Sequence, residues 1–199
     1  MNANENNLAL TAVRLGLLCI ASEGQPFPGR NGGPPGEAIF DSRGAPAAPL
    51  LRTVVLGALM VELARFPEDA VIAGLRSSGL VFGAQLAAFS SRPFVTVWPD
   101  SNRQSGLQRA VEGDVSGKPV VLFDNALATG DSLRLAAARV TESGGKVAGA
   151  LMIGAYREPP AFSFPVIRLF TISQLLHAAQ ELGQISQARL EQLLKNTNS

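Results

Sequence analysis

The residues of this chain that could do chemistry concentrate in one segment, 120–133, which reads VVLFDNALATGDSL. An apolar, β-branched run leads to Asp124 and Asn125, and a turn at 128–132 that contains hydroxyls and glycine then opens a helical pattern. We expect the strand to end at Phe123, so that the turn presents backbone N–H groups and the positive end of the helix dipole. A monophosphate fits such a turn, and the Asp124 carboxylate is placed to accept hydrogen bonds from the hydroxyls of an attached sugar.

Two other segments are weaker candidates for phosphate binding. Residues 113–119 contain Gly-Lys, but Pro119 stands where a Walker loop needs Ser or Thr, and the segment precedes a strand. Residues 144–146 follow a helix and lead into a strand, which is the wrong order for such a loop. On pattern alone, an ordinary polar turn remains an alternative interpretation of 124–132.

The segment lies within an alternation of strand and helix patterns. Strands are expected at 71–74, 94–98, 120–123, 147–153 and 166–170, with helices at 80–89, 133–142, 173–181 and 186–195. This alternation predicts a mainly parallel sheet with helices on both faces. Ligands bind such sheets at the carboxyl ends of the strands, so Arg76, Asp124 and Arg157 are expected to converge there. The alternative is that neither arginine binds a ligand. Arg76 would then be a solvated charge in a loop, and Arg157 would form a surface ion pair with Glu158.

The N-terminal part of the chain has a different pattern. Residues 8–20 have helical apolar spacing, and 23–36 are dense in Gly and Pro, which predicts a loop. A short strand at 38–40 follows, and Pro49 is expected to begin a helix that runs to about Phe66.

Composition predicts one globular domain. Of 199 residues, 46% are hydrophobic and 17% charged, which is enough apolar material for a core. The net charge of +1 gives no general attraction for nucleic acid or membrane, and the apolar stretches are too short to cross a bilayer, so we expect a cytoplasmic protein. Cys19 is the only cysteine and is interpreted as a packed thiol, and His177, the only histidine, as structural or solvated.

Residues 123–132 resemble the ribose-phosphate signature of type I phosphoribosyltransferases, which typically has two acidic residues, two variable positions and then Ala/Thr-Thr-Gly-Gly-Ser/Thr. The resemblance extends along the chain and is closest to orotate phosphoribosyltransferases. Residues 71–89 resemble the pyrophosphate loop and the helix that follows it. Further matching segments in family order are Ile-Phe-Asp-Ser-Arg at 39–43, the strand, loop and Glu-Gly hairpin at 93–113, Tyr156-Arg157 where Asp-Arg is usual, and Leu-Phe-Thr-Ile-Ser-Gln-Leu-Leu at 169–176.

The resemblance implies a Rossmann-like type I phosphoribosyltransferase fold in which residues 1–199 form one domain. Residues 1–45 and 160–199 would contribute a small hood and the terminal helices. The implied reaction joins a nitrogen of a pyrimidine or related base to C1 of phosphoribosyl pyrophosphate and releases pyrophosphate. Mg²⁺ would bridge pyrophosphate and ribose oxygens without ligands directly from the protein, and the chain would form a homodimer.

The resemblance also implies roles for individual residues. Asp124 and Asn125 would meet the ribose hydroxyls, and Arg157 would pair with the pyrimidine. The loop lysines of the family are missing, and Arg103 and Arg109 could substitute for them as charges. The pyrophosphate loop would be Arg76, Ser77 and Ser78, and the 5-phosphate loop Ala128, Thr129, Gly130, Asp131 and Ser132.

Three departures from the family pattern bear on activity. Asn125 replaces a second carboxylate, and residues 98–102 contain no lysine where Arg-Lys-x-x-Lys is usual. Asp131 replaces glycine, and a carboxylate about 5 Å from a phosphate would repel it by about 3 kcal/mol at an effective dielectric constant of about 20, unless the side chain turns outward. The alternative is therefore a catalytically degenerate relative that binds a phosphorylated ligand in a regulatory role. A regulator of the purine-repressor type is disfavoured, because the first 37 residues contain only Arg14 and Arg30 as basic side chains.

Overall fold

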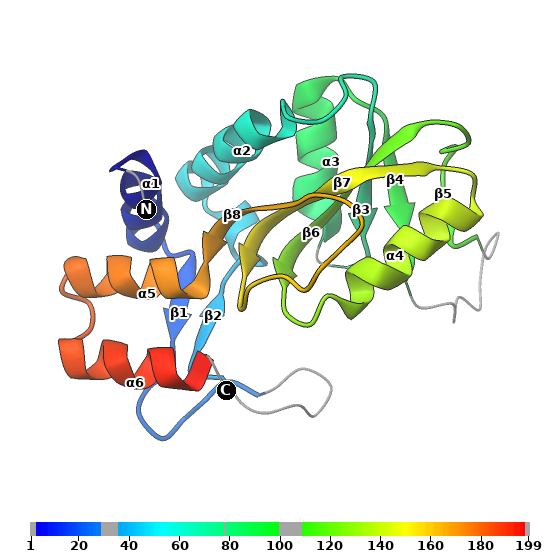
Figure 1. Ribbon diagram of the computed structural model, residues 1–199. Coiled ribbons are helices and arrows are strands. Elements are labelled where there is room, and N and C mark those ends of the chain that lie inside the picture. Colours follow the sequence, from blue (N-terminus) through cyan, green and yellow to red (C-terminus); the bar gives the residue numbers. More distant parts are fainter. Residues whose placement is uncertain (1–2, 29–35, 78, 100–108, 198–199) are drawn as a thin grey trace.

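A six-stranded sheet forms the centre of the protein in the computed structural model, which describes residues 3–28, 36–77, 79–99 and 109–197. The strand order is β5-β4-β3-β6-β7-β8 (Figure 1). The strands are β3 (Val71–Leu75), β4 (Phe94–Val97), β5 (Val111–Glu112), β6 (Pro119–Leu127), β7 (Lys146–Ala155) and β8 (Val166–Thr171). All neighbouring strands are parallel except β4 and β5, so the predicted mainly parallel sheet is confirmed.

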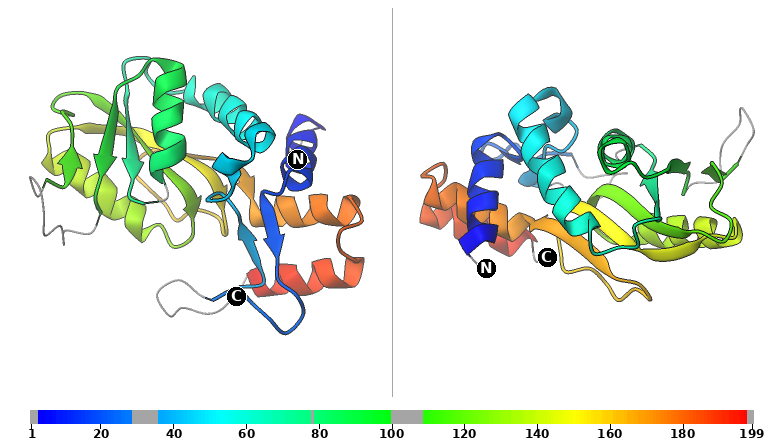
Figure 2. Two further views of the ribbon diagram at one scale, coloured as in Figure 1. Left: turned by 180° about the vertical axis from the view of Figure 1, so that it is seen from behind. Right: turned by 90° about the horizontal axis from the view of Figure 1, so that it is seen from above.

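Helices cover both faces of this sheet. The helices α2 (Pro49–Leu63) and α3 (Gly79–Ser90) pack on one face, and α4 (Asp131–Glu142) packs on the other (Figure 2). Successive strand residues therefore face different helices: Val121 and Phe123 belong to the core beside α3, whereas Leu122 belongs to the core beside α4. Burial on both faces explains why the strands read as continuous apolar runs in the sequence.

Strand β6 is longer than predicted. The expected end at Phe123 is wrong, because β6 continues to Leu127 and stays paired with β7. Its register partners there are Met152 for Asp124, Gly154 for Ala126 and Ala155 for Leu127. Hydrogen bonding to a long neighbouring strand thus holds the acidic segment extended, and the turn begins only at residue 128.

Smaller elements gather at one end of the sheet (Figure 1). These are α1 (Ala3–Arg14), the antiparallel pair β1 (Leu18–Ile20) and β2 (Ala38–Phe40), α5 (Ile172–Glu181) and α6 (Gln187–Thr197); a short 3-10 helix, η2 (Ala45–Ala47), precedes α2. The expectation of one helix over 8–20 is wrong at its end. The chain turns at Gly16, which has a φ of +92°, and the next residues pair with β2.

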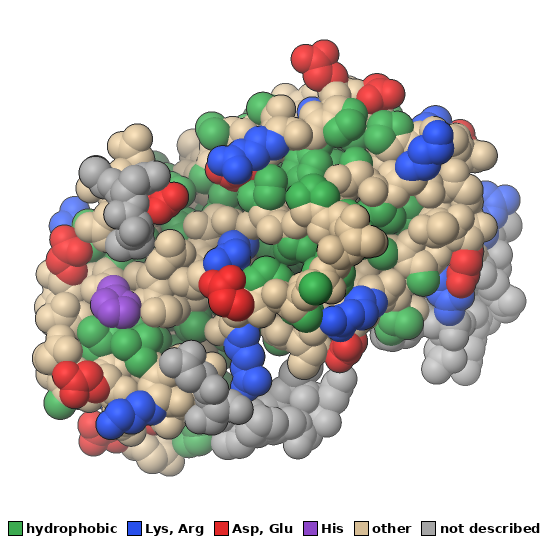
Figure 3. Space-filling view, viewed as in Figure 1, with side chains coloured by type: hydrophobic (Ala, Val, Ile, Leu, Met, Phe, Trp, Pro, Cys, Tyr) green, Lys and Arg blue, Asp and Glu red, His purple; other side chains and the backbone are tan. Residues whose placement is uncertain are grey.

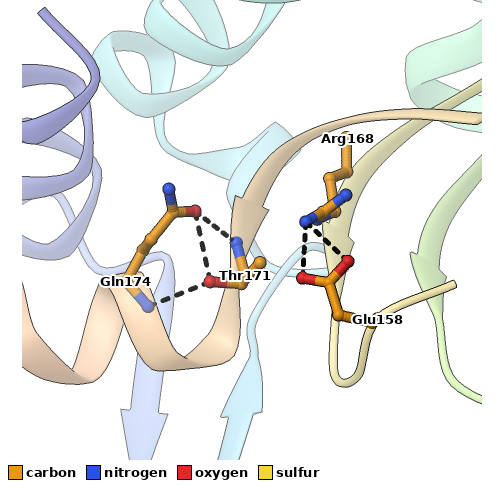
Figure 4. Close-up of polar contacts among 4 residues, drawn as sticks. All are labelled: Glu158, Arg168, Thr171 and Gln174. Carbon is orange, nitrogen blue, oxygen red and sulfur yellow. Dashed lines mark hydrogen bonds and ion pairs between the residues drawn. The ribbon is translucent and has the colours of Figure 1, made fainter. Parts of the chain in front are cut away.

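Local capping explains where α5 begins. The Thr171 hydroxyl accepts a hydrogen bond from the Gln174 backbone N–H at 3.1 Å, and the Gln174 side-chain oxygen accepts one from the Thr171 N–H at 2.7 Å (Figure 4). This reciprocal capping box satisfies two donors at the helix start. It also marks the point at which β8 ends.

The surface carries mixed charge. Basic and acidic side chains are interspersed on the face drawn in Figure 3. In the described ranges, none of the helices is both long and apolar enough to cross a membrane.

Candidate active site

The first residue of α3, Gly79, lies directly against the acidic segment of β6. A Cβ atom on Gly79 would clash with the Phe123 carbonyl oxygen and lie 3.2 Å from the Asp124 Cα. Only glycine allows this approach, because any side chain would push the loop off the strand. The structure therefore brings Arg76 and Ser77, which precede this contact and are joined by a cis peptide bond, to the edge where Asp124 lies. Ser78 lies outside the described residues.

Asp124 and Asn125 are buried polar residues at this edge. Their exposed fractions are 8% and 3%. A carboxylate oxygen of Asp124 accepts a hydrogen bond from the Asn125 backbone N–H at 2.8 Å, and the Asn125 side-chain amide donates to the Ser42 carbonyl oxygen at 3.5 Å. The Asn125 Oδ1 atom is buried and has no hydrogen-bond partner among the described residues. Because a buried acceptor costs free energy until a donor reaches it, Asn125 is a candidate acceptor for a ligand hydroxyl.

The turn between β6 and α4 forms a shallow pocket. Gly130 precedes α4 with a φ of +85°, a left-handed conformation that favours glycine. The pocket is small and partly open to solvent. Its lining comprises the strand end, the whole predicted 5-phosphate loop and one residue of β7: Asp124, Ala126, Leu127, Ala128, Thr129, Gly130, Asp131, Ser132, Leu133 and Met152.

The Asp131 carboxylate is held by contacts within the loop. It accepts a hydrogen bond from the Thr129 hydroxyl at 2.7 Å and pairs with Arg134 Nη1 at 3.3 Å. Arg134 also donates to the Thr129 carbonyl oxygen at 3.4 Å, and its guanidinium lies 5.2 Å from the centre of the Phe162 ring. The Asp131 side chain is 74% exposed, so its charge is both solvated and paired. Sequence reasoning missed Arg134, although the i, i+3 spacing of acid and base was the available signal.

Phe162 and its neighbours cover the other side of this turn. A Cβ atom on Gly130 would lie 2.9 Å from Phe162 Cζ and 3.2 Å from Pro160 Cγ. Phe162 and Phe164 stack with ring centres 5.3 Å apart and belong to the core beside α4. The segment after β7 thus packs against the turn at Gly130.

Arg157 follows β7 at the same edge and is exposed. It makes no hydrogen bond or ion pair with the described part of the chain. The alternative of a pair with Glu158 is wrong, since Glu158 binds Arg168 of β8 with two contacts of 2.8 and 3.1 Å (Figure 4). The register of β7 and β8 explains this pairing, because it places Arg168 beside the loop that follows β7 and contains Glu158.

Tyr156 ties the end of β7 to the small sheet. Its hydroxyl accepts a hydrogen bond from the Phe40 backbone N–H at 3.3 Å, and the two rings pack edge to face at 5.0 Å. Burial raises the pKa of Tyr156 above its usual value of 10.0, and the hydrogen bond from Phe40 opposes this rise. Tyr156 is thus a neutral anchor at neutral pH.

Cys19 and His177 lie on other elements, β1 and α5. Arg103 lies outside the described residues. Cys19 is half-buried on β1 rather than packed in the core, and burial, with a smaller effect of Asp41, raises the pKa of its thiol. His177 is exposed, with Nδ1 2.8 Å from the Ser173 carbonyl oxygen of its own helix. Within the described ranges, no three His, Cys, Asp or Glu side chains form a group that could hold a metal ion.

The fold and the arrangement of these loops define the class of type I phosphoribosyltransferases. Orotate phosphoribosyltransferase from Aeropyrum pernix superposes with a TM-score of 0.71 at 23% identity, over 90% of this chain and 99% of that one. UMP synthase from Leishmania donovani superposes with a TM-score of 0.78 at 18% identity, over 99% of this chain and 42% of that one. Adenine phosphoribosyltransferase from Thermoanaerobacter pseudethanolicus gives 0.62 at 19% identity, over 81% and 99% of the two chains.

Sequence comparison identifies the branch of this class. The orotate phosphoribosyltransferase of Lactococcus lactis subsp. cremoris (strain SK11) is 31% identical over 163 residues, covering 78% of both chains. That of Streptococcus pneumoniae serotype 4 (strain ATCC BAA-334 / TIGR4) is 31% identical over 161 residues, covering 77% of this chain and 76% of its own. No family model matches the chain. At this identity and coverage, the chain belongs to the orotate phosphoribosyltransferase family.

Proposed function

We propose that the protein transfers the phosphoribosyl group of phosphoribosyl pyrophosphate to orotate or a related pyrimidine and releases pyrophosphate. Membership of the orotate phosphoribosyltransferase family supports this activity. The structural observation that carries it is the contact of Gly79, at the start of α3, with Phe123 and Asp124. This contact supports the proposal that pyrophosphate and ribose bind next to each other at one edge of the sheet.

The reaction breaks the bond between C1 of the ribose and a pyrophosphate oxygen and forms a bond between C1 and a ring nitrogen of the base, which gives up its proton. Pyrophosphate leaves with the electron pair of the broken bond, so negative charge grows on it while C1 becomes electron-poor. Donors that are already in position stabilise this charge without reorganising. Arg76, Ser77 and Ser78 take this role in the proposal, with Arg103 as a further charge.

The ribose and the base are assigned to the ends of β6 and β7. Asp124 and Asn125 accept hydrogen bonds from the ribose hydroxyls, a role supported by the orphaned Asn125 Oδ1 atom. Arg157 pairs with the acidic or carbonyl edge of the pyrimidine, a role supported by its exposure and by the engagement of Glu158 elsewhere. Fixed positions for both reactants lower the entropic part of the barrier.

The 5-phosphate is assigned to the turn at 128–132. Its backbone N–H groups and the α4 N-terminus attract an anion. The pairing of Asp131 with Arg134 supports this assignment, because it offsets the negative charge beside the phosphate. The Thr129 hydroxyl donates to Asp131 in this structure, so it reaches a phosphate oxygen only when this hydrogen bond is given up.

Mg²⁺ is proposed as the cofactor. The ion prefers oxygen ligands and usually binds proteins through one or two carboxylates together with substrate phosphates. Asp124 and Asn125 would act on the ion through the ribose hydroxyls that they hold, in line with the expectation that no ligand comes directly from the protein. When bound, Mg²⁺ would neutralise part of the charge on pyrophosphate.

A homodimer is also proposed. Large apolar side chains are exposed on α2 and α3, where hydrophobic side chains gather in Figure 3: Leu50 at 70%, Val61 at 68% and Phe89 at 68%. Light scattering coupled to size-exclusion chromatography should give twice the mass of the chain, and a monomer mass would contradict the dimer.

The cytoplasmic location expected from the sequence stays a prediction, which cell fractionation tests.

Calorimetry with phosphoribosyl pyrophosphate, followed by an assay of pyrophosphate release with a panel of bases, tests the proposed activity. The wild type should bind the substrate and release pyrophosphate with orotate or another pyrimidine, in a reaction that EDTA stops. Asp124→Asn should lower turnover by about a hundredfold or more. Asp69→Asn, at the opposite, amino end of β3, is the matched control and should leave turnover unchanged. Binding without turnover would instead support the regulatory alternative, and no binding would exclude both.

A further inference from the structure

Arg76 and Trp98 lie together at the carboxyl edge of the sheet. Leu75 and Val97 are register partners and the last residues of β3 and β4. The next residue of each segment therefore leaves the sheet from adjacent positions. The guanidinium carbon of Arg76 lies 4.5 Å from the centre of the Trp98 ring.

The backbones that carry both side chains are tied to the sheet. The Arg76 N–H donates to the Val97 carbonyl oxygen at 3.0 Å, and the Trp98 N–H donates to the Ala110 carbonyl oxygen at 2.8 Å. Their starting points are thus fixed by main-chain hydrogen bonds. The fold therefore holds the two side chains close to each other at their backbones.

Stacking affects how Arg76 can bind an anion. An aromatic ring attracts the face of a guanidinium and leaves the N–H groups at its edge able to donate. An arginine that is already held in place also loses less rotamer freedom when the ligand arrives. Since residues 98–102 contain no lysine, more of the charge at this edge falls to Arg76.

We propose that Trp98 is a positioning residue for pyrophosphate, acting through Arg76. It holds the guanidinium by its face and directs the N–H edge toward phosphate oxygens. This inference rests on the proposed function, which assigns Arg76 to pyrophosphate. Trp98 positions the guanidinium in advance, and Arg76 makes the contact with pyrophosphate.

Calorimetric titration of the full chain with inorganic pyrophosphate and Mg²⁺ tests the coupling of the two residues. Trp98→Leu should weaken binding about two- to fivefold, as expected for a cation–π contact at an exposed site, whereas Trp98→Phe should keep most of the affinity. Arg76→Ala should weaken binding about tenfold or more. In the Arg76→Ala background, Trp98→Leu should have no further effect, because the guanidinium through which it acts is gone.

Fluorescence gives an independent readout, because Trp98 is the only tryptophan in the chain. Its emission should change when pyrophosphate binds to the wild type, and the change should be absent in Arg76→Ala. Leu135→Ala replaces an exposed apolar residue of α4 and is the control, with unchanged affinity. Circular dichroism checks that each variant is folded.

Two outcomes separate this inference from the proposed function. If Trp98→Leu costs the same affinity with and without the Arg76 side chain, the positioning role is overturned, while binding by the wild type still supports the function. If the wild type binds neither pyrophosphate nor phosphoribosyl pyrophosphate, the function fails and the inference fails with it.

Discussion

At the scale of single residues, Asp131 is the side chain that most affects the proposed phosphate site. The family pattern has glycine here, and an unpaired carboxylate would repel a phosphate by about 3 kcal/mol at about 5 Å. The structure pairs this carboxylate with Arg134 and the Thr129 hydroxyl, at 74% side-chain exposure. Solvent and the neighbouring cation therefore screen much of the repulsion.

We expect Asp131→Gly to tighten binding of ribose 5-phosphate about fivefold, because the residual repulsion of about 1 kcal/mol is removed. Arg134→Gln should weaken binding by a similar factor, since the carboxylate loses its partner. Isothermal titration calorimetry measures both, with ribose as the uncharged comparison. Equal affinities in the wild type and both variants would contradict a phosphate site at this turn.

Arg157 gives a second prediction at this scale. Since it has no partner in the described part of the chain, it can donate to a base without breaking an ion pair. Arg157→Ala should raise the KM for the pyrimidine about tenfold or more and leave the affinity for phosphoribosyl pyrophosphate nearly unchanged. Steady-state kinetics with each substrate varied in turn measures the difference, and Arg65→Ala, an exposed arginine paired with Glu62, is the control. A loss that falls equally on both substrates would argue against a role in base binding.

At the scale of elements, a partly buried ion pair attaches α6 to the small sheet. Arg189 donates to Glu37 at 3.0 Å and to the Ala21 carbonyl oxygen at 3.0 Å, and Asn196 also donates to Glu37. The side chains of Arg189 and Glu37 are only 10% and 16% exposed. Helix α6 is therefore attached to β2 by contacts that no local sequence pattern predicts.

Arg189→Ala should lower the free energy of unfolding by about 2 kcal/mol, because it leaves a largely buried carboxylate without its main partner. Urea denaturation at neutral pH measures this change.

The hydrogen bond from Arg189, followed by that from Asn196, lowers the pKa of Glu37 below its usual value of 4.5. Stability from this group is thus present above the unfolded-state pKa and is lost as the pH falls through the lower folded-state pKa. Urea titrations between pH 7 and 3 should show the wild-type advantage over Glu37→Gln shrinking below about pH 4.5. A constant difference across that range would contradict the linkage.

At the scale of the whole molecule, one apolar core connects the small end to the central sheet. Residues of α1, α5 and α6 share a cluster with residues of β3, β6 and β7; examples are Val13, Leu176, Leu193, Ile72, Val121 and Leu151. We infer that the chain unfolds as one unit. Calorimetry should give a single transition whose van't Hoff and calorimetric enthalpies agree, coincident with loss of Trp98 fluorescence and of helical circular dichroism. Two separated transitions would show that the terminal elements form a unit of their own.

Elements whose signals are local follow from the amino-acid sequence alone. Apolar runs and helical spacing predicted the helices and every strand of the sheet except the two-residue β5 in their correct order. The motif at 123–132, with the collinear segments around it, predicted the family. These properties follow from residues close in the chain, because periodicity and turn chemistry depend on the immediate neighbours. Tertiary pairing decided the rest: β6 runs to Leu127 because β7 lies beside it, and Leu18–Ile20 is a strand because β2 pairs with it.

The partners of the candidate site residues were likewise decided only by the tertiary structure. Glu158 binds Arg168 rather than Arg157, and Arg76 stacks on Trp98, because strand register brings these pairs together. A sequence shows which side chains exist at the end of each strand. Which of them meet depends on how separate strands align, and that alignment is set by packing across the whole sheet.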